Sequence, residues 1–433
     1  MTEQSSPLER SLVLTVSLAN VEAEVAKRLK HTAKNIRMDG FRPGKAPMKI
    51  VEAQYGDQLM REVLSESAQG SFAAEVQKQG LHVAGAPHFE TVSTRNDHGD
   101  YEFKATFEVF PEFTLGDISA AEIERPVVHV EEADVDRTIE VLRKQRTRWL
   151  AATRPAQEGD RLKINYKGFK EDIAFDGGTA ENQMIVLGAG QFLPDFEKAL
   201  PGAAVGETRS FDMTFPEDYH AKDLAGTPVR FEVTVNEIQM PELPAIDADF
   251  ARMLGIESGD LELMRTEIKG NLERETKRRI QTKLKDQVMK VLYESTTVEC
   301  PKSLIQNEIE GLRESARQDW RMRTGKDTQG VELPAALFEE QAKRRVALGM
   351  ILTEVVEKHA LKAEPSQIRA FLQEEAQSYE DPEEMLKWFY EQPGRLQEAE
   401  SVVLEDNVVE WAMKTAKVLD KSLPFQELIG QTA

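Results

Sequence analysis

LKINYK, residues 162–167, alternates apolar and polar side chains without a break. That period of two is typical of a β-strand with one buried face. FDMTF at residues 211–215 and VRFEVTV at 229–235 repeat the pattern, and Pro194 begins a short helical stretch. We therefore predict that residues 156–242 form a small antiparallel sheet around one short helix.

The residues before this sheet mix both kinds of element. SLVLTVSL at 11–18 has the composition of a strand, and residues 101–109 alternate apolar and polar side chains again. Between them Asn20 stands where it would cap a helix ending near Arg37, because asparagine is a favoured helix cap. We predict an α+β domain over residues 1–112.

A connector is predicted next, over residues 113–155. It begins with a short extended piece and continues as a charged helix, in which Val135, Ile139 and Trp149 recur at roughly helical spacing.

The remaining residues, 243–433, carry an almost continuous helical signal. Apolar residues from Leu337 to Leu361 follow helical spacing, and one unbroken helix there would be about 40 Å long. The fold class predicted for the chain is multidomain α+β, with an α+β N-terminal domain, a small antiparallel-sheet middle domain and an all-helical C-terminal domain with long helical arms.

Composition limits the classes of protein to consider. The 433 residues include 76 acidic and 55 basic side chains, which gives a formal net charge of −21. Such acidity argues against a general nucleic-acid coat protein, because phosphate binding requires positive surface. Cys300 is the only cysteine, so no intramolecular disulfide forms. The polar start and the lack of a long apolar run predict a cytoplasmic protein with no membrane partner.

Motifs for nucleotide or metal chemistry are incomplete in this sequence. The glycines of residues 40–46 are spaced one residue too short for a phosphate-binding loop, and Ala46 stands where serine or threonine is needed. Gly188 and Gly190 lack the third glycine of a dinucleotide loop, and the histidines show no paired metal spacing. We expect no cofactor and no metal site.

One loop differs in character from the rest of the chain. Two glycines and two prolines shape residues 38–47 into a tight turn, with Phe41 and Arg42 exposed at its tip. Residues 27–49 contain eight basic side chains against the single acid Asp39. A solvated helix face followed by a turn would explain this composition. Docking on an anionic ribonucleoprotein surface would explain it too.

Three segments resemble trigger factor, the family of bacterial ribosome-associated chaperones. They are GFRPGKAP at 40–47, FPEDYHAKDLAG at 215–226 and ELPAALFEEQAKRRV at 332–346. The resemblance implies an ATP-independent chaperone that contacts the large ribosomal subunit near the peptide exit tunnel and shields unfolded nascent polypeptides between helical arms. We also expect a weak homodimer off the ribosome. The residues implied to bind the ribosome are Gly40, Phe41, Arg42, Pro43, Gly44 and Lys45.

The middle domain resembles prolyl isomerases of the FK506-binding-protein type, through Tyr-x-Gly at 166–168, Phe-Asp at 175–176 and Leu-Gly at 187–188. An apolar pocket would speed rotation about an X–Pro bond by favouring the less polar twisted amide over the planar one. The residues implied to be catalytic are Tyr166, Phe175, Asp176, Phe192, Leu193, Phe196, Tyr219 and Phe231.

Two departures from that isomerase pattern leave other readings open. Gln183 stands where an aromatic pocket wall is usual, and residues 171–174 lack the usual turn glycine. The aromatic residues would then be only the core of a small β domain, and the chain a non-enzymatic holdase. A free prolyl isomerase without ribosome contact is the third reading.

Overall fold

The structure is a computed structural model, which describes residues 7–35, 41, 47–93, 100–171, 173–219, 221–222, 224–325, 333–377, 379 and 381–430. The side chains of Ser93, Asp176 and Pro393 also lie outside the described part. By its internal contacts the chain divides into two units, residues 1–125 with 281–421, and residues 126–280 with 422–433.

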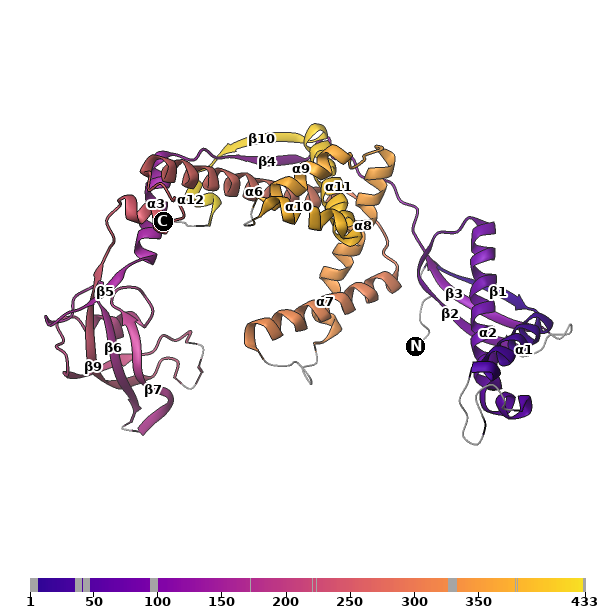
Figure 1. Cartoon of the computed structure of the whole chain (residues 1–433), viewed down its shortest axis with the longest axis horizontal. Coiled ribbons are helices and arrows are strands. Elements are labelled where there is room, and N and C mark those ends of the chain that lie inside the picture. Colours follow the sequence, from indigo (N-terminus) through magenta and orange to yellow (C-terminus); the bar gives the residue numbers. More distant parts are fainter. Residues whose placement is uncertain are drawn as a thin grey trace. The chain divides into compact units, whose positions relative to one another are not determined.

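The first unit begins with an antiparallel sheet in the order β1-β3-β2, formed by Glu9–Val16, Tyr101–Val109 and Val83–Ser93. Two helices accompany it, α1 (Leu18–Asn35) and α2 (Met48–Gln79) (Figure 1). Phe72 of α2 packs edge-on against Phe89 and Phe107 of the sheet, with ring centroids 5.8 and 5.0 Å apart. Aromatic and aliphatic burial therefore joins α2 to the sheet.

The predicted cap of α1 is wrong. The helix already begins at Leu18, so Asn20 lies inside its first turn. The N–H of Leu18 donates instead to the carboxylate of Asp100, 3.1 Å away and 82 residues later. A carboxylate satisfies a free N–H at a helix start regardless of its distance in sequence.

The helical part of the first unit is built on α6 (Leu261–Ser295), whose residues from Gln281 onward belong to it. It continues with α7 (Lys302–Thr324), α8 (Glu339–Lys358), α9 (Pro365–Ala376), α10 (Pro382–Glu391) and α11 (Pro393–Thr415). A proline begins each of the last three, where its missing N–H costs nothing. Ile118 and Ile123, which come well before these helices in the chain, are buried among Val288, Ile351 and Val408 of the helices.

The helical region departs from its sequence pattern at two places. Residues 337–361 are not one helix, because a 3₁₀ turn (η1, Ala335–Leu337) ends at Phe338 and α8 then begins anew. Phe338 packs beside Ile305, Ile309 and Leu312, which fixes the break. Strand β10 (Lys417–Ser422) lies inside the region predicted to be helical, and it pairs with β4 (Glu122–Val127).

The second unit contains a five-stranded antiparallel sheet in the order β5-β9-β6-β7, with β8 also paired to β9. Its strands are β5 (Arg148–Ala151), β6 (Arg161–Lys170), β7 (Ile173–Val186), β8 (Thr208–Thr214) and β9 (Pro228–Glu242). The predicted short helix is α4 (Pro194–Lys198), which buries Phe196 in the core of the sheet. The antiparallel sheet around one helix is confirmed.

Further helices complete the second unit: α3 (Glu132–Gln145), α5 (Ala248–Met253), the first part of α6, and α12 (Phe425–Leu428). Trp149 is not in the predicted connector helix. It lies on β5, opposite Pro241 of β9, and the guanidinium of Arg161 lies 4.6 Å from the centre of its ring. Of the helices that the structure describes, none combines the length and apolar character needed to cross a membrane.

Candidate active site

A cavity of about 510 Å³ opens on the sheet of the second unit. Aromatic and aliphatic side chains and glycines form nearly all of its wall. The lining residues are Tyr166, Phe175, Gly177, Gly178, Gly190, Gln191, Phe192, Leu193, Phe196, Met213, Phe215, Tyr219, Ala221, Leu224 and Phe231. A pocket of this size and character is typical of small-molecule and peptide-binding sites.

Strand register brings distant aromatic residues together on one face of the sheet. Tyr166 of β6 pairs with Val233 of β9, and Phe231 of β9 pairs with Phe211 of β8. Because side chains two residues apart on a strand share a face, Phe231 lies beside Tyr166, with ring centroids 6.0 Å apart. These two residues are 65 positions apart in the sequence and form one wall.

Phe196 of α4 is the centre of the aromatic cluster. Its ring stacks on Phe192 at 4.9 Å between centroids and makes edge contacts with Phe231 at 5.3 Å and Phe211 at 5.4 Å. Only 2% of Phe196 is exposed. The helix therefore supplies the floor on which the other rings rest.

Two glycines make room for the ring of Phe175. A Cβ atom on Gly168 or on Gly178 would lie 2.6 Å from that ring. Since real Cβ atoms do not come so close to a neighbour, any other residue at these positions would push Phe175 out of place. The glycine of the Tyr-x-Gly motif thus has a steric role in shaping the cavity.

Seven of the eight residues predicted to be catalytic line this one cavity: Tyr166, Phe175, Phe192, Leu193, Phe196, Tyr219 and Phe231. Asp176 follows Phe175 on β7, and its side chain lies outside the described residues. Their catalytic roles stay predictions. Of the residues predicted to bind the ribosome, Gly40, Arg42, Pro43, Gly44 and Lys45 lie outside the described residues, and Phe41 is 37% exposed.

The sequence reasoning missed Met213, Phe215 and Leu224 as wall residues. The alternation of FDMTF puts positions 211, 213 and 215 on one face, so the period of β8 carried the signal. The interpretation of Gln183 as a polar pocket wall is wrong, because its exposed side chain does not line the cavity. Glu171 takes the place of the missing turn glycine with a φ of 51°, the left-handed backbone that a tight hairpin requires.

The described lining contains no acidic, basic or histidine side chain. Burial, and secondarily the nearby Tyr219, raise the pKa of the Tyr166 hydroxyl above its ordinary value of 10.0. A raised pKa means that the phenol holds its proton to higher pH in the fold than it would in water. Tyr166 is therefore neutral, and able to donate a hydrogen bond, throughout the physiological range.

We predict that the kcat/KM for prolyl isomerisation stays constant, within about twofold, from about pH 7 to pH 9. The reason is that the described wall has no acidic, basic or histidine side chain, and that the pKa of Tyr166 is raised above its ordinary value of 10.0. A protease-free assay on a fluorescent prolyl peptide would measure it. A sigmoidal fall with a midpoint inside the interval would contradict the neutral pocket, and the same curve for Tyr166→Phe would show whether the tyrosine is responsible.

Three family models match most of the chain. The family model described as bacterial trigger factor protein matches residues 1–142, and the one described as trigger factor C-terminus matches residues 260–414. The family model of FKBP-type peptidyl-prolyl cis-trans isomerase matches residues 152–236, between the other two. Among solved structures, one described as showing promiscuous substrate recognition by the trigger factor chaperone covers 96% of this chain at 17% identity, with a TM-score of 0.45.

Full-length relatives are similar throughout. Trigger factor of Azoarcus sp. (strain BH72) is 48% identical over 99% of this chain and 98% of its own length. That of Aromatoleum aromaticum is 48% identical over 100% of this chain and 99% of its own length, and that of Dechloromonas aromatica 49% over 99% of both. This chain therefore belongs to the trigger factor family, chaperones of unfolded nascent chains, and carries an FKBP-type peptidyl-prolyl cis-trans isomerase domain.

Proposed function

We propose that this chaperone works in the cytoplasm, docked on the large ribosomal subunit near the peptide exit tunnel. In this proposal residues 1–112 form the docking domain, 156–242 the isomerase and 243–433 the client-binding domain, with 113–155 connecting them. The aromatic cavity is the observation that carries the isomerase role. The basic segment around residues 27–49 supports the docking role.

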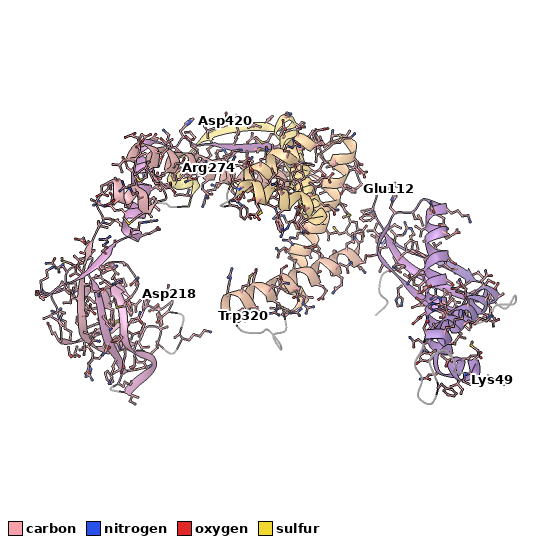
Figure 2. The ribbon with its side chains drawn as sticks, viewed as in Figure 1. Lys49, Glu112, Asp218, Arg274, Trp320 and Asp420 are labelled. Atoms are coloured by element: carbon pink, nitrogen blue, oxygen red, sulfur yellow. The ribbon has the colours of Figure 1, made fainter. Side chains whose placement is uncertain are left out.

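Exposed cations on both sides of the loop, and exposed apolar side chains after it, support docking. Lys30 and Lys34 of α1 and Lys49 of α2 are exposed, and Lys49 is labelled in Figure 2. Met48 and Ile50 beside it are 42% and 41% exposed. Positive and apolar groups presented together suit a surface made of both RNA and protein.

The local charge is smaller than a count over residues 27–49 suggests. Lys27 pairs with Glu24 at 3.0 Å, and Arg28 makes a double contact with Glu66 at 3.0 and 2.6 Å. Both acids lie outside that interval of sequence. The positive groups that support docking are thus concentrated toward the loop rather than spread along α1.

The isomerase mechanism follows from the chemistry of the cavity. Planarity of the amide carries charge separation that water stabilises, and the rotational barrier is about 18–20 kcal/mol. An apolar wall removes that stabilisation from the planar form, while the twisted form, which is less polar, loses little. The neutral hydroxyl of Tyr166 is available to orient the substrate carbonyl. The reaction needs no nucleophile.

Client binding in the helical domain is supported by exposed apolar residues. Met322 is 78% exposed, Leu337 70% and Trp388 42%. Ile351, Val355 and Val403 of the same domain are buried in its core instead. Separate small apolar sites give weak, exchangeable binding, because ordering costs offset much of each contact.

Co-sedimentation with purified ribosomes tests the docking proposal. We expect the wild-type chain to pellet with ribosomes and the variant Phe41→Ala/Arg42→Ala/Lys45→Ala to stay largely in the supernatant, because the change removes two cations and the exposed ring. Wild-type pelleting should also weaken as salt is raised, since contacts to RNA phosphates release counterions.

The matched control is Trp320→Ala/Arg321→Ala/Arg323→Ala at the end of α7, where Figure 2 labels Trp320. Trp320 is 54% exposed. It removes an exposed ring and two cations from a different place and should pellet like wild type. Equal pelleting of wild type and the loop variant would place docking elsewhere. If the wild type does not pellet at all, the chain is a free isomerase or holdase.

The non-enzymatic holdase remains the alternative from another class. The observation that favoured it was a polar wall at Gln183, and that side chain lies off the cavity. Turnover on a prolyl peptide separates the two readings directly, since a holdase would bind the peptide without speeding its isomerisation.

A further inference from the structure

Glu197 is a buried carboxylate for which the mechanism above has no use. It lies on α4 next to Phe196, and 8% of it is exposed. Its Oε2 accepts hydrogen bonds from the N–H groups of Gly188 at 3.0 Å and Gly190 at 3.3 Å, and its Oε1 accepts one from the N–H of Phe192 at 3.0 Å. Hydrogen bonds to an ionised acceptor are stronger than those between neutral groups.

All three donors belong to the short segment 188–193, which joins β7 to α4. Gly188 and Gly190 have φ values of 81° and 67°, in the left-handed region. Left-handed residues in such a turn aim neighbouring N–H groups toward one point and create an anion-binding concavity. Here the side chain of Glu197 fills the concavity, so the N–H groups of segment 188–193 surround its carboxylate.

The same segment is a wall of the isomerase cavity. Gly190, Gln191, Phe192 and Leu193 all line it. Phe192 is held twice, by its N–H on Glu197 and by its ring, which stacks on Phe196. The carboxylate therefore determines where this wall lies relative to the aromatic floor.

We propose that Glu197 is a positioning residue of the isomerase. Its carboxylate holds segment 188–193 in the shape that decides which side chains next to the proline the cavity accepts. It acts through the backbone of Gly190 and Phe192 and does not touch the substrate. The inference rests on the cavity being the isomerase site, as proposed above.

Glu197→Gln in the full-length chain tests the proposal. The amide has nearly the same shape but keeps only one acceptor oxygen, so at least one of the three N–H donors loses its partner. Values of kcat and KM are measured on prolyl peptides that differ in the residue before proline. We expect kcat/KM to fall at least about fivefold, mainly through KM, and the order of preference among the peptides to change.

The matched control is Asp160→Asn. Asp160 is a second buried carboxylate of the same domain, 1% exposed, whose side chain accepts from Arg154 and from the N–H of Gln157, neither of which lines the cavity. It should lower the melting temperature while leaving KM and the order of preference as in the wild type. Glu197→Asp, which keeps the charge but is one methylene shorter, should show an intermediate change and serves if the glutamine variant does not fold.

The outcomes separate this inference from the proposed function. If the glutamine or aspartate variant lowers the melting temperature but keeps the wild-type KM and preference, Glu197 is merely structural and the inference is overturned. If the wild type itself does not turn over any peptide, the isomerase site fails and the inference fails with it. A change of preference in the Glu197 variants alone supports it.

Discussion

Gly116→Ala is expected to lower the free energy of unfolding of the helical core by about 3 kcal/mol. A Cβ atom at this position would lie 1.9 Å from the carbonyl oxygen of Ser295 and 2.5 Å from its carbonyl carbon. Both are backbone atoms at the end of α6, so they cannot turn aside as a flexible side chain would. The N–H of Gly116 also donates to the hydroxyl of Thr296 at 3.0 Å. Any shift that relieves the collision breaks this bond.

Urea unfolding followed by far-ultraviolet circular dichroism measures the effect. Gly311→Ala on α7 is the matched control, because a Cβ there meets nothing within 4 Å. In this control the free energy of unfolding should stay unchanged or rise by about 0.5–1 kcal/mol, because alanine is favoured over glycine in a helix interior. An unchanged midpoint for Gly116→Ala would show that the chain before α3 is not fixed to α6 as described.

Phe196→Leu should reduce kcat/KM for prolyl isomerisation by about ten- to a hundredfold. Leucine keeps an apolar side chain in the core but loses the ring that contacts Tyr166, Phe192 and Phe231. Aromatic pairs contribute about 0.5–1.5 kcal/mol each, so losing three of them removes on the order of 1.5–3 kcal/mol, which corresponds to that range of rate if the loss falls on transition-state binding. Steady-state turnover on a prolyl peptide, with the melting temperature recorded beside it, measures both consequences.

Phe72→Leu is the control for this second prediction. Phe72 is a buried ring with two edge contacts in the N-terminal sheet region, far from the cavity in sequence and outside its lining. Phe72→Leu should lower the melting temperature, as Phe196→Leu does, and leave kcat/KM unchanged. Both Phe196→Leu and Phe196→Ala should still pellet with ribosomes. Wild-type turnover in both Phe196 variants would refute the role of this residue in the pocket.

The sequence by itself determined the features that depend on local spacing. Strict alternation identified β6, β8 and β9 of the middle sheet, because a period of two admits only one buried face. Pro194 indicated the start of the short helix α4, since proline is tolerated in the first turn of a helix. The resemblance to FK506-binding-protein-type isomerases, carried by the motifs at 166–168 and 175–176, indicated residues that line one cavity.

The tertiary structure decided whatever depends on partners far away in the chain. The cap of α1 comes from Asp100, β10 becomes a strand because β4 offers it an edge, and Trp149 leaves the helical pattern because β9 pairs with its strand. Likewise, the amino-acid sequence around Gly116 does not reveal that the carbonyl of Ser295 lies beside this glycine. The spacing of apolar residues shows the period of a segment but not which other segment packs against it. Long-range contacts override the local preference for helix or strand wherever they compete with it.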